Sequence, residues 1–144
     1  MAKKEIKTDF WVYGLLQEAG LNLTPQGCDI KEVDEALKTA SKAQTGNVGY
    51  PEYCGIVKDF LLVIEDKATL EKHIVRNDKK LISQDVKSVK DYAVNGALFY
   101  GLHLAAHTSF HKVLAFGVSG NEKRHRITPI FINERGDYQE LSDV

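Results

Sequence analysis

The sequence predicts an α/β fold in which helices flank a mixed central β-sheet. Three observations predict it: two amphipathic helical patterns open the chain, an apolar β-hairpin follows them, and a longer helical pattern separates that hairpin from a second group of strands. Strands and helices that follow one another in this order favour a layered domain with helices packed on a sheet. The 144 residues are enough for one domain with a substantial core.

The composition is that of a globular protein without a membrane segment. Hydrophobic residues make up 43% of the chain and charged residues 27%, both ordinary values for soluble domains. No apolar run approaches the ~20 residues of a membrane span, and the charged N-terminus lacks the adjoining apolar stretch of a secretory signal. Cys28 and Cys54 have no metal-ligand spacing. We therefore expect a cytoplasmic protein with free thiols and no membrane partner.

The formal net charge of −1 provides no overall attraction to nucleic acid, so any such contact must come from local patches. One basic cluster, which consists of Lys123, Arg124 and Arg126, is suited to phosphate contacts. An equally good explanation is that these charges lie on a solvated strand edge and prevent aggregation there. Lys42 lies in a polar, glycine-bearing loop over residues 41–49, which is either a second phosphate contact or a plain connector.

The chain opens with two amphipathic helices. The first covers residues 5–19 and ends at Gly20, and its apolar stripe consists of Val12, Leu15, Leu16 and Ala19. A polar loop over residues 21–29 ends at Asp29, a natural N-cap for the second helix. One face of that helix is apolar and is formed by Ile30, Val33, Ala36, Leu37 and Ala40.

A β-hairpin is predicted over residues 52–57 and 60–67, with Lys58 and Asp59 as a two-residue turn. In this register Glu52 lies directly opposite Glu65, and Lys67, two residues further on, points to the same face of the sheet. The sequence therefore brings two carboxylates and one ammonium group together on one small patch.

Like charges that oppose each other across a strand pair destabilise the sheet, so the presence of the Glu52–Glu65 pair requires a compensating interaction. A hard divalent cation such as Mg²⁺ supplies one, because it prefers carboxylate oxygens, and a lysine beside it would stabilise charge on a phosphate or orient a water. The alternative is an exposed hairpin with ordinary surface charges.

The second half of the chain predicts one long helix and three strands. The helical pattern covers residues 84–106, and the apolar run at residues 113–118 predicts a central strand. A strand follows over residues 126–133, where Pro129 indicates an edge position or a bulge, and a short closing strand covers residues 138–141. Three histidines recur at a spacing of four, but no nearby Cys or acid completes a zinc site, so we interpret them as a polar helix face: His103, His107 and His111.

The hairpin motif resembles that of the PD-(D/E)xK nuclease superfamily. Pro51-Glu52 corresponds to the family's Pro-acid pair, with Glu where Asp is usual, and Glu65-Asp66-Lys67 corresponds to Glu-x-Lys. Three sequence segments are also similar to N-terminal nuclease domains of type I and related restriction–modification enzymes. They are Ala40-Ser41-Lys42, Gly49-Tyr50-Pro51-Glu52 and Val63-Ile64-Glu65-Asp66-Lys67.

This resemblance implies a restriction-endonuclease-like αβββαβ core, of which one strand is not evident from the sequence. It implies a magnesium-dependent endodeoxyribonuclease, with Mn²⁺ as a substitute, whose catalytic residues are Glu52, Glu65 and Lys67. Its metal ligands would be Glu52, Glu65 and the main-chain carbonyl of Asp66. Residues 1–144 would form a single nuclease domain at the N-terminus of a longer protein, with DNA and methyltransferase, specificity or motor domains or subunits as partners. A catalytically inactive nucleic-acid-binding or assembly module with the same fold is the alternative.

The resemblance also suggests accessory residues from helices. In the family a glutamate of the first helix leans toward the active site, which makes Glu5 a candidate. The simpler explanation is that Glu5 is an acid in the first turn, where the helix dipole favours it, or that it precedes an N-cap at Thr8. The helix after the Glu-x-Lys strand often lends a polar side chain, and Gln84, Lys87 and Tyr92 are the candidates there.

Overall fold

The structure is a computed structural model and describes residues 3–21, 23–25, 30–40 and 51–144. Its central sheet has six strands in the order β1-β2-β3-β4-β5-β6, so neighbours in sequence are neighbours in the sheet. The strands are β1 (Thr24–Pro25), β2 (Tyr53–Val57), β3 (Phe60–Lys67), β4 (Lys112–Gly120), β5 (His125–Asn133) and β6 (Tyr138–Glu140). The helices are α1 (Lys3–Glu18), α2 (Lys31–Leu37), the 3₁₀ turn η1 (Leu70–Lys72), α3 (Val86–Asp91) and α4 (Ala93–His107).

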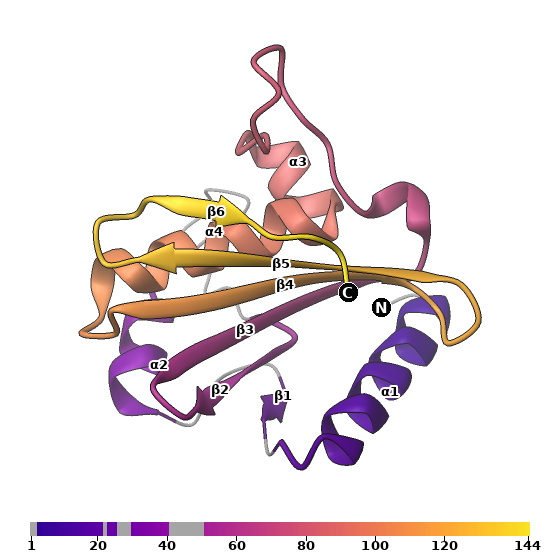
Figure 1. Cartoon of the computed structure of the whole chain (residues 1–144), viewed down its shortest axis with the longest axis horizontal. Coiled ribbons are helices and arrows are strands. Elements are labelled where there is room, and N and C mark those ends of the chain that lie inside the picture. Colours follow the sequence, from indigo (N-terminus) through magenta and orange to yellow (C-terminus); the bar gives the residue numbers. More distant parts are fainter. Residues whose placement is uncertain (1–2, 22, 26–29, 41–50) are drawn as a thin grey trace.

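The sheet is mixed, as the sequence predicts. Strands β3 and β4 are parallel, and every other neighbouring pair is antiparallel. A parallel pair requires a crossover connection, and η1, α3 and α4 provide it. Figure 1 shows α1 on one side of the sheet and α4 on the other. The order of elements confirms the αβββαβ core. The strand that was not evident in the sequence is the two-residue strand β1, which lies within the predicted loop over residues 21–29.

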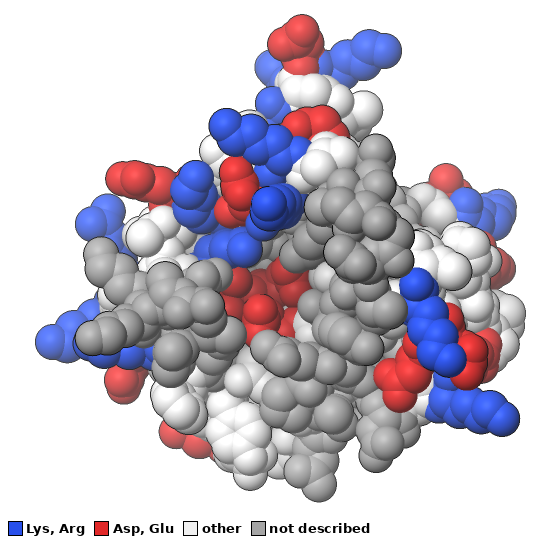
Figure 2. Space-filling model, turned by 180° about the vertical axis from the view of Figure 1, so that it is seen from behind, with Lys and Arg blue, Asp and Glu red and all other residues white. Residues whose placement is uncertain are grey.

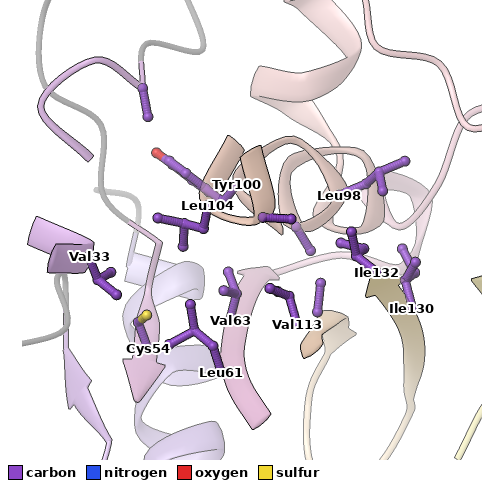
Figure 3. Packing of buried hydrophobic residues seen from close by; sticks show 14 of the residues in the cluster. Val33, Cys54, Leu61, Val63, Leu98, Tyr100, Leu104, Val113, Ile130 and Ile132 are labelled. Atoms are coloured by element: carbon purple, nitrogen blue, oxygen red, sulfur yellow. The ribbon is translucent and has the colours of Figure 1, made fainter. Parts of the chain in front are cut away.

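Two apolar clusters hold these layers together. The larger one joins α2 and α4 to one face of the sheet and includes Leu61, Val63, Leu98, Leu104 and Ile130 (Figure 3). The smaller one joins α1 to the opposite face through Val12, Leu16, Leu62 and Ile64. Alternate residues of β3 thus point into different clusters, which fixes the face that each later residue of the strand occupies.

The predicted long helix over residues 84–106 is wrong, because Tyr92 has an extended backbone and separates α3 from α4. In one continuous helix the amide of Val94 would donate to the carbonyl of Lys90, but here it donates to His73 O at 2.8 Å. Asp85 caps α3 by accepting a hydrogen bond from the amide of Ser88. A contact that is distant in sequence thus sets where α4 begins.

The first helix begins earlier than predicted and ends as predicted. Gly20 has a φ of +73°, the left-handed conformation that commonly ends a helix. Thr8 is buried within α1 and donates to Gly120 O at 2.9 Å, so the alternative that it is an N-cap is wrong. Of the predicted stripe, Val12 and Leu16 are buried, whereas Leu15 and Ala19 are exposed.

The predicted ends and faces of the other elements are largely confirmed. Of the predicted apolar face of the second helix, Val33, Ala36 and Leu37 are buried within α2, and Ala40 is buried after it. Ile30 precedes the helix and is half-buried, and the proposed cap, Asp29, lies outside the described residues. Pro129 is not on an edge strand, but it lies beyond the paired residues of β6, where its carbonyl accepts from the amide of Leu141. Its missing N–H therefore interrupts no strand pair. Helix α4 ends at His107, so His111 is not in line with the other two histidines.

Candidate functional site

The hairpin has the register that the sequence predicts. Val57 pairs with Phe60, and the ladder continues outward to Tyr53 opposite Ile64. Lys58 in the turn has a φ of +56°, as expected for a tight hairpin. Glu52 directly precedes β2, and the same register places it opposite Glu65.

The two glutamates meet at the end of this hairpin. The amide of Glu52 donates a hydrogen bond to Glu65 Oε1 at 3.1 Å, over a separation of 13 residues. Glu65 is only 3% exposed, although a carboxylate is rarely buried so completely unless it has partners. Leu61 and Val63 point into the larger apolar cluster, so Glu65 and Lys67 lie on that same face, beside α4. The patch predicted from the hairpin register is therefore present.

Tyr100 of α4 is a site residue that the sequence interpretation missed. It is 2% exposed, and Figure 3 shows its phenol oxygen pointing out of the apolar cluster. Burial and the negative charges of Glu65 and Glu52 raise the pKa of the Tyr100 phenol, so both carboxylates act on this hydroxyl. The signal was available, because Tyr100 continues the apolar spacing of Ala97 and Leu104, and a buried phenol needs a polar neighbour.

A second polar chain lies on the same face, next to the end of β3. Lys67 pairs with Ser119 across the parallel ladder. Ser119 Oγ lies 2.6 Å from Nδ1 of the buried His73, and the other ring nitrogen lies 2.7 Å from Thr128 Oγ1. Thr128 in turn donates to Asp143 at 2.6 Å. Burial lowers the pKa of His73 to about 4, so this histidine is neutral at pH 7.

The donor chemistry of the site fits a hard divalent cation. Glu52 and Glu65 offer carboxylate oxygens on one patch, and Mg²⁺ typically uses one or two carboxylates and keeps several waters. In the described part of the chain, no three His, Cys, Asp or Glu side chains are grouped so that they could hold a metal ion. Asp66 is buried, and its side chain points to the opposite face from Glu65, which leaves the predicted role to its carbonyl.

The predicted accessory residues are placed less favourably. Gln84 precedes α3 and donates from Nε2 to the carbonyls of Ser83 and Asn95, each at 3.1 Å. Lys87 is exposed on α3, and Tyr92 lies beneath the ammonium group of Lys72 at 5.4 Å. Glu5 belongs to the first turns of α1, but its side chain lies outside the described residues.

The predicted basic patch divides in the structure. Arg126 is paired with Asp143 at 2.9 Å. Lys123 and Arg124 are exposed in the β4–β5 turn. Arg124 also lines a cavity of about 710 Å³ that lies between the start of α1 and the residues after β3, together with Lys7. The other predicted contact, Lys42, lies outside the described residues.

The face seen from behind carries a hollow lined with acidic side chains (Figure 2). Figure 2 shows acidic side chains at the bottom of a hollow near its middle, with Lys and Arg side chains beside it. The fold is a mixed α/β sheet domain with a restriction-endonuclease-like core, and its central hairpin ends in two carboxylates and a lysine.

Comparison with known proteins links the chain to restriction–modification. It is 31% identical over 136 residues, or 93% of its length, to the type II restriction enzyme and methyltransferase RM.BcgI of Heyndrickxia coagulans. It spans 21% of the length of that protein. No family model matches the chain, and no solved structure matches it. Among the described residues, no helix is long and apolar enough to cross a membrane.

Proposed function

We propose that this chain is a metal-dependent DNA endonuclease domain of a restriction–modification system. The observation that carries the proposal is the meeting of Glu52 and Glu65 at the end of an apolar hairpin, with Lys67 on the same face. The similarity to a restriction enzyme that is also a methyltransferase supports it. By the same similarity, we propose that the domain works with methyltransferase, specificity or motor domains or subunits.

The carboxylates of Glu52 and Glu65 and the main-chain carbonyl of Asp66 would hold Mg²⁺, or Mn²⁺ in its place. The bound cation would lower the pKa of a water and offset charge on the phosphate. Glu65 is almost completely buried, so its carboxylate lies in a medium of lower dielectric constant than water, where electrostatic interactions are stronger.

Lys67 would provide a positive charge that orients the attacking water and stabilises the negative charge that builds up on the phosphate oxygens. In the reaction, a water oxygen forms a bond to phosphorus and the bond from phosphorus to one bridging oxygen breaks. The water loses a proton and the leaving oxygen gains one, so that a phosphate monoester and an alcohol result. Tyr100, on the helix α4 that packs on this face of the sheet, would help to keep both carboxylates in a low-dielectric environment.

Nicking of supercoiled plasmid tests this proposal. Wild type should nick the plasmid with Mg²⁺ or Mn²⁺ and not with a chelator, and Lys67→Ala should lose the activity by a factor of ~10² or more. Lys58→Ala is the matched control, because Lys58 lies at the opposite end of the hairpin and should retain activity. If Lys67→Ala binds DNA but both it and wild type fail to nick under all metal conditions, the non-cleaving module is the correct interpretation.

A further inference from the structure

Between η1 and α3 the chain forms a small projecting hairpin, residues 75–83, which we call the arm. Arg76 and Ile82 pair across its base, and the amide of Asn77 donates to Leu81 O at 2.9 Å. The tip is a tight turn in which Lys80 N donates to Asn77 O and Lys80 has a φ of +65°. Figure 1 shows the arm projecting beyond α3 at the top of the molecule.

The base of the arm is anchored by one buried side chain. Asn95, in the first turn of α4, is 0% exposed. Its Oδ1 accepts from the amide of Val75 at 3.1 Å, and its Nδ2 donates to Val75 O at 2.9 Å and to Ser83 O at 2.7 Å. One amide group thus ties both strands of the arm to α4, so the arm is held in a fixed direction.

The anchor lies close to the candidate active site. Val94, which precedes Asn95, packs so tightly on β4 that a Cβ atom at Gly117 would lie 2.6 Å from Val94 N. Gly117 is the strand neighbour of Glu65 in the parallel ladder. The start of α4, to which Asn95 ties the arm, therefore packs on the strand neighbour of Glu65, and the same helix carries Tyr100.

The charge of this part of the chain is opposite in sign to that of the whole. Residues 68–92 contain six Lys and Arg against four Asp and Glu, although the whole chain has 19 against 20. Lys79 and Lys80 are exposed at the tip beside one exposed acid, Asp78, whereas the acid Asp85 is used as the cap of α3. Figure 2 shows Lys and Arg side chains, with some acidic ones among them, between the projecting tip and the acidic hollow.

We propose that the arm contacts the phosphate backbone of duplex DNA beside the Glu52–Glu65–Lys67 site, with Lys79 and Lys80 as its phosphate ligands. This inference rests on the proposed nuclease function. Two carboxylates at the active site repel a polyanion until a cation is bound, and a fixed basic arm offsets this repulsion. The contact is to phosphate and therefore positions the duplex without reading its sequence.

The test is the salt dependence of binding to a ~25-bp duplex, measured with a chelator so that cleavage does not interfere. Each lost phosphate contact lowers the slope of log affinity against log salt by ~0.9, so Lys79→Gln/Lys80→Gln should lower it by ~2 and weaken binding at least about tenfold at 0.1 M salt. The matched control is Lys31→Gln/Lys58→Gln, which removes the same charge from two exposed sites far from the arm. Lys58 has a positive φ, as Lys80 does, so the two double variants are also matched in backbone conformation.

Equal slopes in the two double variants would show that the arm makes no phosphate contact. If Lys67→Ala meanwhile abolishes nicking, only the arm inference is wrong and the nuclease function stands. If Lys67→Ala nicks like wild type, the nuclease mechanism fails whatever the arm does, and a wild type that binds no duplex at low salt overturns both. If the arm binds an acidic protein instead of DNA, the arm variant should bind polyglutamate more weakly than wild type does. The slope of log DNA affinity against log salt would then be unchanged, which also contradicts the inference.

Discussion

The backbone amide of Glu52 donates a hydrogen bond to the carboxylate of Glu65 across the open end of the β2–β3 hairpin. A carboxylate that accepts from the backbone is fixed in position, but it does not lose its charge, so the second carboxylate, that of Glu52, still repels it. This combination of a fixed geometry and an unfavourable charge is what a cation-binding site requires.

Neutralising one carboxylate should separate these two effects. Glu65→Gln keeps an oxygen that can accept from the Glu52 amide and removes the repulsion, so we expect the metal-free protein to unfold at a higher temperature than wild type. Wild type should gain stability with Mg²⁺ or Mn²⁺ by linkage, and the variant should not. The measurement is thermal unfolding with metal and with chelator. An equal metal-induced shift in both proteins would show that Glu65 is not a ligand.

Asp59 should have no role in the site, although its spacing to Glu65 also forms an acid-x₅-Glu-x-Lys pattern. The two residues lie six positions apart along the hairpin, or ~20 Å at the rise of a strand, which one cation cannot bridge. Asp59 is exposed and is paired with Lys112 at 2.8 Å. Asp59→Asn should therefore leave nicking and the metal-induced shift unchanged; an inactive but folded variant would contradict the hairpin register.

Removal of Asn95 should cost more stability than its size suggests. Asn95→Ala leaves the amide of Val75 without its acceptor and takes one of two donors from the carbonyls of Val75 and Ser83, so we expect a loss of about 1–3 kcal/mol in the free energy of unfolding. The control is Asn133→Ala, because the Asn133 side chain also hydrogen-bonds to the backbone, accepting from the amides of Arg135 and Asp137, but in an exposed turn. Chemical denaturation measures both, and similar losses would show that Asn95 is not a special anchor.

His73 should make stability depend on pH on the acid side. Its folded pKa of about 4 lies below the ordinary 6.5, because burial and Arg126 disfavour its charged form, while Asp143 and Glu140 favour it. The unfolded chain therefore takes up the proton first, and stability that is present above pH 6.5 is lost as the pH falls toward 4, by at most about 3 kcal/mol. His73→Gln can still bridge Ser119 and Thr128, but it does not titrate. When the free energy of unfolding is measured at several pH values, the variant should therefore lose less stability than wild type between pH 6.5 and pH 4.

Tyr100 should have the corresponding effect on the alkaline side. Its folded pKa is raised above 10 by burial, Glu65 and Glu52, so the stability that it contributes is complete below pH 10 and is lost as the pH rises further. Tyr100→Phe should remove this part of the alkaline destabilisation. Glu65→Gln should reduce it, because one of the two charges is gone. If Tyr100→Phe and wild type lose stability in parallel above pH 10, the phenol is not held by this environment.

Local pattern alone determined the hairpin and the patch that it carries. A two-residue turn fixes the register of its strands, and the period of two places Glu52, Glu65 and Lys67 on one face without any knowledge of the remaining chain. The apolar run of β4 and the stop of α1 at Gly20 were predictable for the same reason, since each depends on residues a few positions apart.

The tertiary structure decided what depends on contacts between distant residues. The break at Tyr92 follows from the hydrogen bond between Val94 and His73, the arm is fixed by a side chain 20 residues from Val75, and Arg126 is engaged by Asp143 near the C-terminus. Tyr100 has the spacing of a core residue, and only the packing of α4 on the sheet brings its hydroxyl near the two carboxylates. Periodicity reports which face of an element is buried, but it does not report which element covers that face, because the covering contacts are made across the chain.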